Sequence, residues 1–453
     1  MKFRQLNTLM IGLLTVFISS CRTGPGLEVA YFQADVTPPI GSPVAYAPTR
    51  SVTDSLSARG VVLVPRGQQP VVLCSVDWIA VSNESMDLFR SYLAKAAKTT
   101  PDRVSIHTVH QHDTPWCDAT SEKILAAHGL GGRQFDLAFL DDCMKRTADA
   151  VASAVSDLRP VKAIGFGEAK VEKVASNRRI LGEDGKVRIV RFSSARDSAA
   201  INAPEGVIDP FLKSVTFRDD NDKAIATLNY YATHPQSYYG KGDVNPEFIG
   251  LARNAVHQKT GVPQVFFIGA AGNIAAGKYN NGSPEMRPVL KERIMNAMEE
   301  AFANATPAEV PEEIGWRSEP LSLPFGNHLQ ADTLRLIVAD TSNSYVDRFA
   351  AVRQLAWLEQ NKNGSPLVVT SLQLGNTWLL HLPGEPFVEY QLAAQKLKPG
   401  GHVCTAAYGD DGILYIGTEI SYGQGGYEVE KRVNMTTPEA ESIMMTTIQK
   451  ALQ

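Results

Sequence analysis

Two histidines that stand two residues apart, His110 and His112, are the first candidates for chemistry in this chain. They lie in the segment Ser105–Pro115, directly after an apolar alternating run, together with His107. On a β-strand, residues i and i+2 face the same side, so both imidazoles can enter one pocket. Imidazoles grouped in this way suit a zinc site or an acid/base site. The alternative is a strand-end loop whose histidines are structural and hydrogen-bonded.

Three later segments carry polar side chains close to the ends of predicted strands. His234 follows a long apolar run, and Glu385 follows a proline–glycine turn and precedes a predicted helix. Tyr415 lies in a glycine-rich stretch. A proline–glycine turn can direct a carboxylate off a strand end. Each residue taken alone also has an ordinary structural explanation, as a satisfied histidine, a turn or a packing tyrosine, and the residues alone leave both roles open.

Strands and helices alternate along most of the chain. Runs rich in Val, Ile, Phe or Thr predict strands over 60–64, 71–76, 104–109, 164–166, 187–192, 224–231, 265–268, 367–374, 378–382 and 403–407. Helical patterns predict helices over 84–97, 135–155, 248–259, 288–303, 346–360 and 387–396. This alternation predicts an α/β fold with a mixed β-sheet core flanked by helices. Polar residues that follow strands are then expected at the active edge of the sheet.

Residues 29–453 are predicted to form one composite catalytic domain. The widest shift in composition, Ala305–Glu313, predicts a loop between two lobes, but candidate residues fall on both sides of it. No low-complexity linker and no internal repeat is detectable. The four cysteines after Cys21 show no close pairing, so we expect at most one disulfide.

The first 20 residues are predicted to be a lipoprotein signal peptide. Lys2 and Arg4 precede the apolar core Leu9–Ile18, which is followed by two serines and Cys21. The core is shorter than the about 20 apolar residues of a transmembrane helix. Acylation of Cys21 would hold the exported protein at the cell envelope, in the periplasm or on the outer surface, with residues 21–28 as a tether. The alternative is an ordinary signal peptide with a chance cysteine.

The composition is that of a globular protein, with 44% hydrophobic residues, 20% charged residues and a net charge of −4. Nucleic-acid-binding proteins normally carry a basic face, so the charge argues against that class. The expected partners are a small-molecule or lipid-like substrate and, through the lipid anchor, a membrane. The oligomeric state is left open.

Six segments, taken in order, resemble motifs of the neutral/alkaline ceramidases, a family of zinc amidases. They are Ala34–Gly41, Ile106–Asp113, Ser176–Arg179, Ala232–Pro235, Leu382–Glu385 and Tyr415–Tyr422. The resemblance implies a ceramidase-like catalytic domain and zinc bound by His110, His234, Glu385 and Tyr415. It also implies that His112 and Arg178 line the site without binding the metal.

The chemistry implied by this resemblance is hydrolysis of an amide or ester bond by zinc-activated water. Zinc accepts imidazole nitrogen and carboxylate oxygen as ligands, and it lowers the pKa of bound water to about 7. His112 is then placed to move a proton to the leaving amine. Arg178 can hold a developing oxyanion or an acidic group of the substrate.

Two departures from the family pattern bear on the substrate. The family's serine lies in a segment of the form Gly-Asn/Asp-x-Ser-Pro, which aligns with Gly272–Ala276 and places Ala275 at the serine position. The second departure is that we expect no counterpart after Tyr427 of the immunoglobulin-like domain that full-length ceramidases carry. We therefore expect hydrolysis without a covalent intermediate, and a substrate other than ceramide.

Two other functions compete with this interpretation. The first is a non-catalytic surface lipoprotein that keeps the fold for ligand binding, which Ala275 favours and the intact ligand set opposes. The second is an amidohydrolase-type metal barrel, which the His-x-His pair at a strand end favours. In those barrels the pair usually lies on the first strand, whereas several predicted strands precede it here, and Glu385 has no obvious role in such a barrel.

Overall fold

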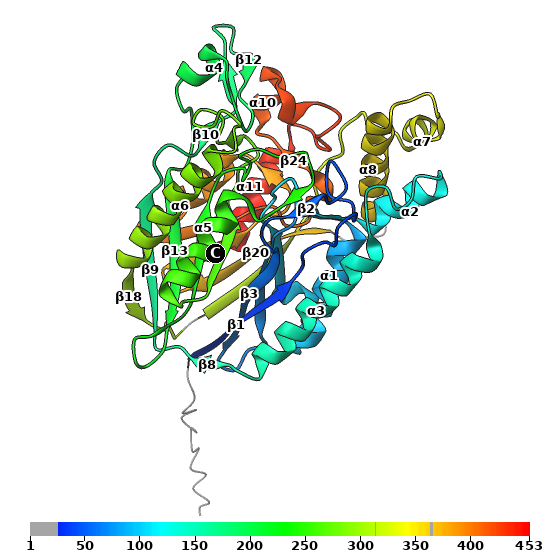
Figure 1. Cartoon of the computed structure of the whole chain (residues 1–453). Helices are drawn as coiled ribbons and strands as arrows, with labels where there is room; N and C mark the ends of the chain where they lie inside the picture. Colours follow the sequence, from blue (N-terminus) through cyan, green and yellow to red (C-terminus); the bar gives the residue numbers. More distant parts are fainter. Residues whose placement is uncertain (1–25, 313, 363–365) are drawn as a thin grey trace, which may run out of the picture.

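The computed structural model describes residues 26–453 except 313 and 363–365 (Figure 1). The predicted signal peptide and Cys21 lie outside the described residues.

Three sheets form the core of the fold (Figure 1). Their strand orders are β6-β4-β3-β1-β8, β16-β14-β13-β9-β18 and β19-β20-β21-β23. The strands of the first sheet are β1 (Leu27–Asp35), β3 (Ser57–Pro65), β4 (Val71–Val76), β6 (Val104–Thr108) and β8 (Arg159–Pro160). Those of the second are β9 (Ala163–Lys170), β13 (Phe211–Arg218), β14 (Ala224–Tyr231), β16 (Gln264–Ile268) and β18 (Thr306–Glu309). Those of the third are β19 (Ile314–Leu321), β20 (Leu367–Leu374), β21 (Thr377–His381) and β23 (His402–Ala406).

Helices and short strands surround these sheets. The helices are α1 (Glu84–Ala97), α2 (Ala119–Ala127), α3 (Leu137–Val155), α4 (Ser198–Asn202), α5 (Glu247–Thr260), α6 (Met286–Ala303), α7 (Ala331–Ala339), α8 (Tyr345–Lys362), α9 (Val388–Lys396), α10 (Glu419–Gln424) and α11 (Ala440–Ala451). The short strands are β2 (Ser51–Val52), β5 (Ala80–Val81), β7 (Trp116–Cys117), β10 (Ser176–Asn177), β11 (Arg179–Leu181), β12 (Val187–Val190), β15 (Asp243–Val244), β17 (Ile274–Ala275), β22 (Glu385–Pro386) and β24 (Tyr415–Ile416).

The same order of elements occurs three times along the chain. Two antiparallel pairings are followed by a helix and a parallel strand in β1-β3-β4-α1-β6, in β9-β13-β14-α5-β16 and in β19-β20-β21-α9-β23. A further helix, α3, α6 or α11, then packs on the first strands of its sheet. The chain thus repeats its topology although no repeat is detectable in its sequence. Topology depends on the pattern of apolar residues rather than on their identity, so the repeat leaves no visible period in the sequence.

An apolar core lies between the three sheets. Val29 of the first sheet, Val215 of the second and Leu379 of the third belong to one cluster of buried residues. Two other clusters lie on the outer faces of the sheets, under helices such as α1 and α3 or α5 and α6. Beyond the strand ends, Thr108 N donates to the carbonyl of Tyr408 at 2.9 Å. Polar side chains that follow the strands are thus directed toward one end of the molecule.

The predicted fold class, an α/β fold with a mixed sheet core flanked by helices, is confirmed. The bounds of β4, β14, β20 and α1 agree with the prediction, whereas β1, β13, β19, α2, α7 and α11 were missed. The predicted loop over 305–313 is wrong in part, because it contains β18, which pairs with the edge of β9. All four residues of β18 are exposed, so it has none of the apolar alternation by which a strand is recognised.

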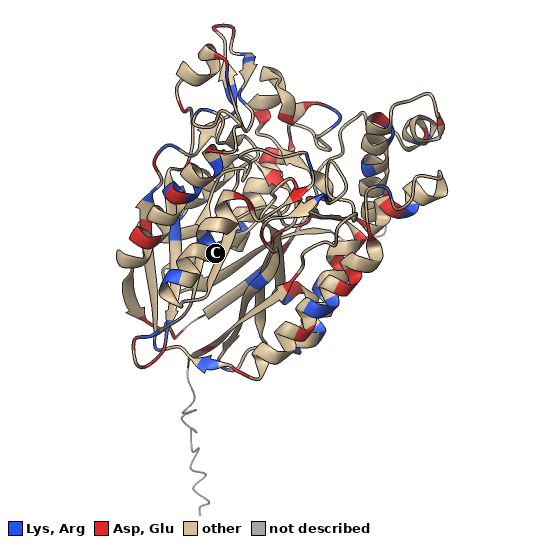
Figure 2. Cartoon of the chain, in the orientation of Figure 1, with Lys and Arg blue, Asp and Glu red and all other residues tan. Residues whose placement is uncertain are grey.

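The surface charge, the cysteines and the hydropathy of the helices bear on the expectations drawn from the composition. Acidic and basic side chains are mixed along the outer helices α3 and α6 (Figure 2). The cysteines within the described residues are all buried and free, in keeping with at most one disulfide. In the same part of the chain, no helix combines the length and apolar character needed to cross a membrane.

A buried ion pair joins α5, which packs on the second sheet, to the residue that follows β4 of the first sheet. Arg253 of α5 donates to Asp77, which follows β4, with Nη1–Oδ1 at 2.7 Å and Nη2–Oδ2 at 2.9 Å, and neither side chain is exposed. Burial alone would raise the pKa of Asp77, but the charge and hydrogen bonds of Arg253 hold it below its usual value. The pair therefore stays charged inside the protein.

We expect Asp77→Ala to lower the free energy of unfolding by about 3–5 kcal/mol, because it leaves a buried guanidinium without its counter-charge. Urea unfolding of the full chain measures this change. The control is Asp332→Ala, which removes the exposed partner of Arg335 and should leave the free energy of unfolding unchanged. Equal effects of the two substitutions would contradict the argument.

Candidate metal centre

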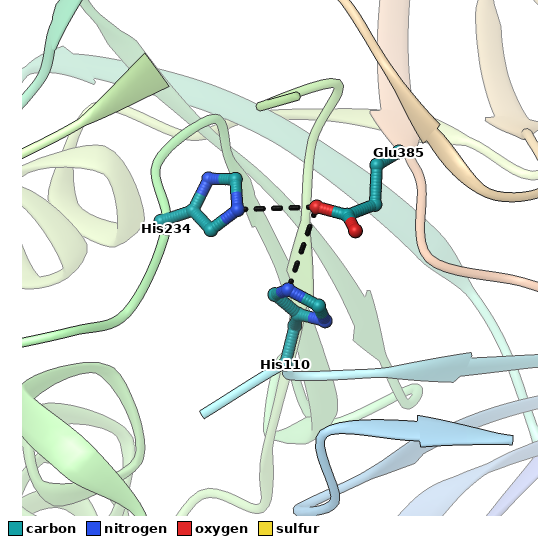
Figure 3. Close-up of side chains that lie close together, drawn as sticks. All are labelled: His110, His234 and Glu385. Atoms are coloured by element: carbon teal, nitrogen blue, oxygen red, sulfur yellow. Dashed lines mark hydrogen bonds and ion pairs between the residues drawn. The ribbon is translucent and has the colours of Figure 1, made fainter. Parts of the chain in front are cut away.

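Three side chains, one from each sheet, converge beyond the carboxyl ends of β6, β14 and β21 (Figure 3). His110 comes two residues after β6, His234 three residues after β14, and Glu385 four residues after β21. The Oε2 atom of Glu385 lies 3.1 Å from Nε2 of His234 and 3.5 Å from Nε2 of His110. The three ligand atoms all lie within 4.8 Å of one another, and all three side chains are buried. This is the spacing of side chains that share one metal ion.

Backbone carbonyls orient both imidazoles. His110 Nδ1 lies 2.7 Å from the carbonyl oxygen of Ile79, and His234 Nδ1 lies 2.9 Å from that of Ile274. A carbonyl only accepts, so each Nδ1 carries the proton and each Nε2 presents a lone pair toward Glu385. Burial lowers the pKa of His110 to about 4 and that of His234 to about 3, so both rings are neutral. Neutral imidazoles with the far nitrogen held in this way are the usual form of a metal ligand.

Glu385 lacks the counter-charge that its burial calls for. Within the described residues its ion-pair contacts are with these two histidines, which are neutral. Burial raises the pKa of Glu385, although His110, Arg178 and a hydrogen bond from Tyr415 oppose the rise. A buried carboxylate that faces two neutral rings is costly unless a proton or a cation joins it. The set of two nitrogens and one oxygen therefore fits a divalent cation, and zinc takes ligands of this kind.

His110 does not lie on a strand, contrary to the reason given for pairing it with His112. Strand β6 ends at Thr108, and His110 has a backbone φ of 65°, in the left-handed region. Such a conformation costs a non-glycine residue about 1–3 kcal/mol and is found most often at functional sites. The His110 amide donates to the carbonyl of Trp78 at 2.9 Å, which holds this turn. The imidazole packs on Tyr408, with ring centroids 4.4 Å apart.

Tyr415 lies beside Glu385. Strand β24 pairs in parallel with β22, and the register places Tyr415 opposite Glu385. Side chains directly opposite in a ladder project from the same face, which brings the phenol to the carboxylate. Arg178 Nη1 donates to the Tyr415 hydroxyl at 3.2 Å. Burial raises the pKa of Tyr415 well above its usual value, so the free hydroxyl keeps its proton.

Arg178 is buried behind Tyr415 and is held by a carboxylate that the sequence reasoning missed. Its Nε lies 3.3 Å from Glu428 Oε1, and its guanidinium stands 5.3 Å from the ring centroid of Tyr427. Glu428 also accepts from Arg179 Nη1 at 2.9 Å. Glu428 directly follows Tyr427 and a pair of glycines, and this position after a turn was the only signal that could have pointed to it.

His112 lies beside His110 but outside the group of three ligands. The two ring centroids are 5.2 Å apart and the rings are nearly perpendicular. His112 is half-buried, its Nδ1 is 2.8 Å from the hydroxyl of Tyr46, and its Nε2 contacts the amide of Gln236. The Tyr239 ring packs on it at 4.7 Å. Both ring nitrogens of His112 are thus held by uncharged polar groups at the open side of the site.

His107 does not join the site. Its Nδ1 is 2.7 Å from the carbonyl of Ala407, and its Nε2 is 2.9 Å from Nδ1 of His381. Both histidines are buried, and the His107 ring packs on Phe267 of the core between the sheets. The structural explanation offered for the histidines of this segment therefore holds for His107.

The segment that contains Ala275 contacts the backbone and side chains of the candidate ligands. Ile274 accepts from His234, and the Gly272 amide donates to the carbonyl of Pro386, next to Glu385, at 2.9 Å. Ala275 is buried and pairs with Ser176, whose hydroxyl donates to the Ala275 carbonyl at 2.9 Å. The residue aligned with the family's serine therefore sits directly after a residue that orients a ligand.

The fold resembles solved ceramidases. No protein-family model matches the chain, and no significant match was found among curated proteins. The structure is similar to that of neutral ceramidase from Pseudomonas aeruginosa, with a TM-score of 0.68 and 16% sequence identity over 94% of this chain and 74% of that chain. A ceramidase complexed with C2 gives a TM-score of 0.67 at the same identity and coverage. At this identity the similarity establishes the fold.

Proposed function

We propose that this chain is a metal-dependent hydrolase of an amide or ester bond. Zinc is the metal, and His110, His234, Glu385 and Tyr415 are its protein ligands. The observation that carries the proposal is the buried group in which two neutral imidazoles and one carboxylate face one another. The ceramidase-like fold supports the amide class.

Each remaining side chain of the site has a role in this proposal. A zinc ion bound there would lower the pKa of water and polarise a carbonyl oxygen. His112, at the open side, takes the proton of the attacking water and passes it to the leaving amine. Arg178, fixed by Glu428, holds the negative charge that develops on the carbonyl oxygen.

A screen of N-acyl amines and carboxylic esters tests the proposal. We expect hydrolysis of at least one class, its loss after treatment with a chelator, and its return when zinc is added. The competing function is a non-catalytic binding protein, which Ala275 favours. Zinc-loaded protein that hydrolyses no member of the panel would establish that alternative instead.

Ala275 leads to a prediction about the reaction course. Alanine cannot attack a carbonyl, so we expect no acyl group on the protein during turnover, and little or no hydrolysis of ceramide. Mass spectrometry of reactions quenched with acid measures the mass of the chain. Ala275→Ser, which should fold normally, serves as the comparison. An acyl adduct on the natural protein, or efficient cleavage of ceramide, would contradict this prediction.

A further inference from the structure

A pocket of about 610 Å³ lies beside the candidate metal centre. Two tyrosines of its wall connect it to the site. The Tyr46 hydroxyl is 2.8 Å from His112, and the Tyr427 ring centroid is 5.7 Å from that of Tyr415. A molecule in the pocket is therefore in reach of the proposed catalytic groups.

Aromatic rings form one side of this pocket. The ring centroid of Phe349 is 5.6 Å from that of Trp116 and 5.9 Å from that of Tyr345. Val44 and Val433 add aliphatic surface. Walls of this kind bind the apolar body of a ligand.

The polar lining of the pocket is cationic. It contains Arg133, Arg353 and Arg432, and the described lining residues include no aspartate or glutamate. Arg133 and Arg432 are exposed at the rim, whereas Arg353 is half-buried and lies 5.2 Å from the Trp116 ring centroid. An arginine-lined, carboxylate-free pocket has a positive potential that attracts anions.

Arg353 has donors without partners. Its Nε is buried and makes no hydrogen bond, and in the described part of the chain its guanidinium has no ion-pair contact. Asp411 and Glu385 attract it only from a distance. An unpaired buried donor carries a desolvation cost that an acceptor on a ligand would remove.

We propose that the substrate is an organic acid, with an apolar body that fills this pocket and a carboxylate that pairs with Arg353. A guanidinium binds both oxygens of a carboxylate in parallel, which also sets the direction of the ligand. The scissile amide or ester bond then extends past Tyr46 toward His112. The identification of a substrate rests on the proposed hydrolase function, but the binding of an organic acid can be measured separately.

The binding test uses 4-phenylbutyrate and its neutral analogue 4-phenylbutanamide, titrated calorimetrically into the purified full chain. We expect the carboxylate to bind at least about tenfold more tightly than the amide, since a hydrogen bond to a charged group contributes about that much. Arg353→Gln should abolish this preference. The control Arg335→Gln removes an exposed arginine of α7, away from the pocket, and should keep it.

Equal binding of the two probes to the natural protein, or a preference that persists in Arg353→Gln, would overturn the proposal. The second result would also arise if the carboxylate bound the metal instead of the arginine. If Arg353→Gln does not fold, Arg353→Lys replaces it and should reduce the preference severalfold, since an ammonium group cannot pair both oxygens in parallel. An unchanged preference in Arg353→Lys would then be the contradicting result.

A second experiment distinguishes failure of this proposal from failure of the hydrolase function. It measures hydrolysis of N-acetylphenylalanine and of its neutral carboxamide, with the release of acetate as the readout. We expect Arg353→Gln to lower kcat/KM for the acid by at least about tenfold more than kcat/KM for the carboxamide. Arg353-dependent binding, together with no turnover of these two compounds or of any member of the panel described above, would refute the hydrolase function alone. Turnover of both compounds that the Arg353→Gln substitution leaves unchanged would refute the present proposal alone.

Discussion

His234→Ala is expected to empty the metal site and to abolish hydrolysis. The natural protein should purify with about one zinc per chain, because the proposed ligands His110, His234, Glu385 and Tyr415 would leave a position for water, as a catalytic zinc site requires. The substitution removes one of the two proposed nitrogen ligands and leaves Glu385 facing a single ring. Zinc content, measured by mass spectrometry of the metal, should fall below about a tenth of that value.

The matched control is His128→Ala, which removes an exposed histidine at the end of α2. This variant should keep its zinc and its activity. Thermal unfolding of both variants shows whether each is folded. A folded His234→Ala protein with full zinc content would show that the three side chains do not hold the metal.

The second large effect is expected for His112→Ala, which should lower kcat by about 10²–10⁴-fold, the usual contribution of a positioned acid/base group. Its zinc content should not change, because His112 lies outside the group of three ligands. Tyr46→Phe removes the hydroxyl that holds His112 Nδ1 and should lower kcat by a smaller factor.

Zinc content and kcat together separate the two roles that His112 could have. Loss of zinc in His112→Ala would make it a ligand rather than an acid/base group. A kcat equal to that of the natural protein would remove it from the reaction. Either result would contradict the role assigned to His112.

The chemistry-bearing residues were predictable because they follow strands. His234 and Glu385 come three and four residues after β14 and β21, and the carboxyl ends of these strands bring them to the same place. The spacing of His110 and His112 predicted that the two rings lie close together, and their centroids are 5.2 Å apart, but the reason given for it was wrong. The left-handed backbone conformation of His110, and not strand alternation, directs its ring. Nothing in the local sequence predicts that a histidine adopts this conformation.

Residues that act through tertiary contacts were not predictable. Glu428 has only its position after a glycine turn as a local signal, and Gln236 has none, so it is the folded chain that brings them to Arg178 and His112. His107 shares its segment with His110 and His112 yet belongs to the core, because it lies on β6, whereas the other two follow that strand. The threefold repeat of topology was hidden for a related reason, since the sheets share only their pattern of apolar residues. Export and acylation at Cys21 stay predictions.

The most direct measurement of the central claim is anomalous diffraction at the zinc absorption edge from crystals of the purified protein. The proposed function predicts one peak, about 2.0–2.2 Å from Nε2 of His110, Nε2 of His234 and a carboxylate oxygen of Glu385. No peak among these three side chains, in crystals of protein that contains zinc, would contradict it.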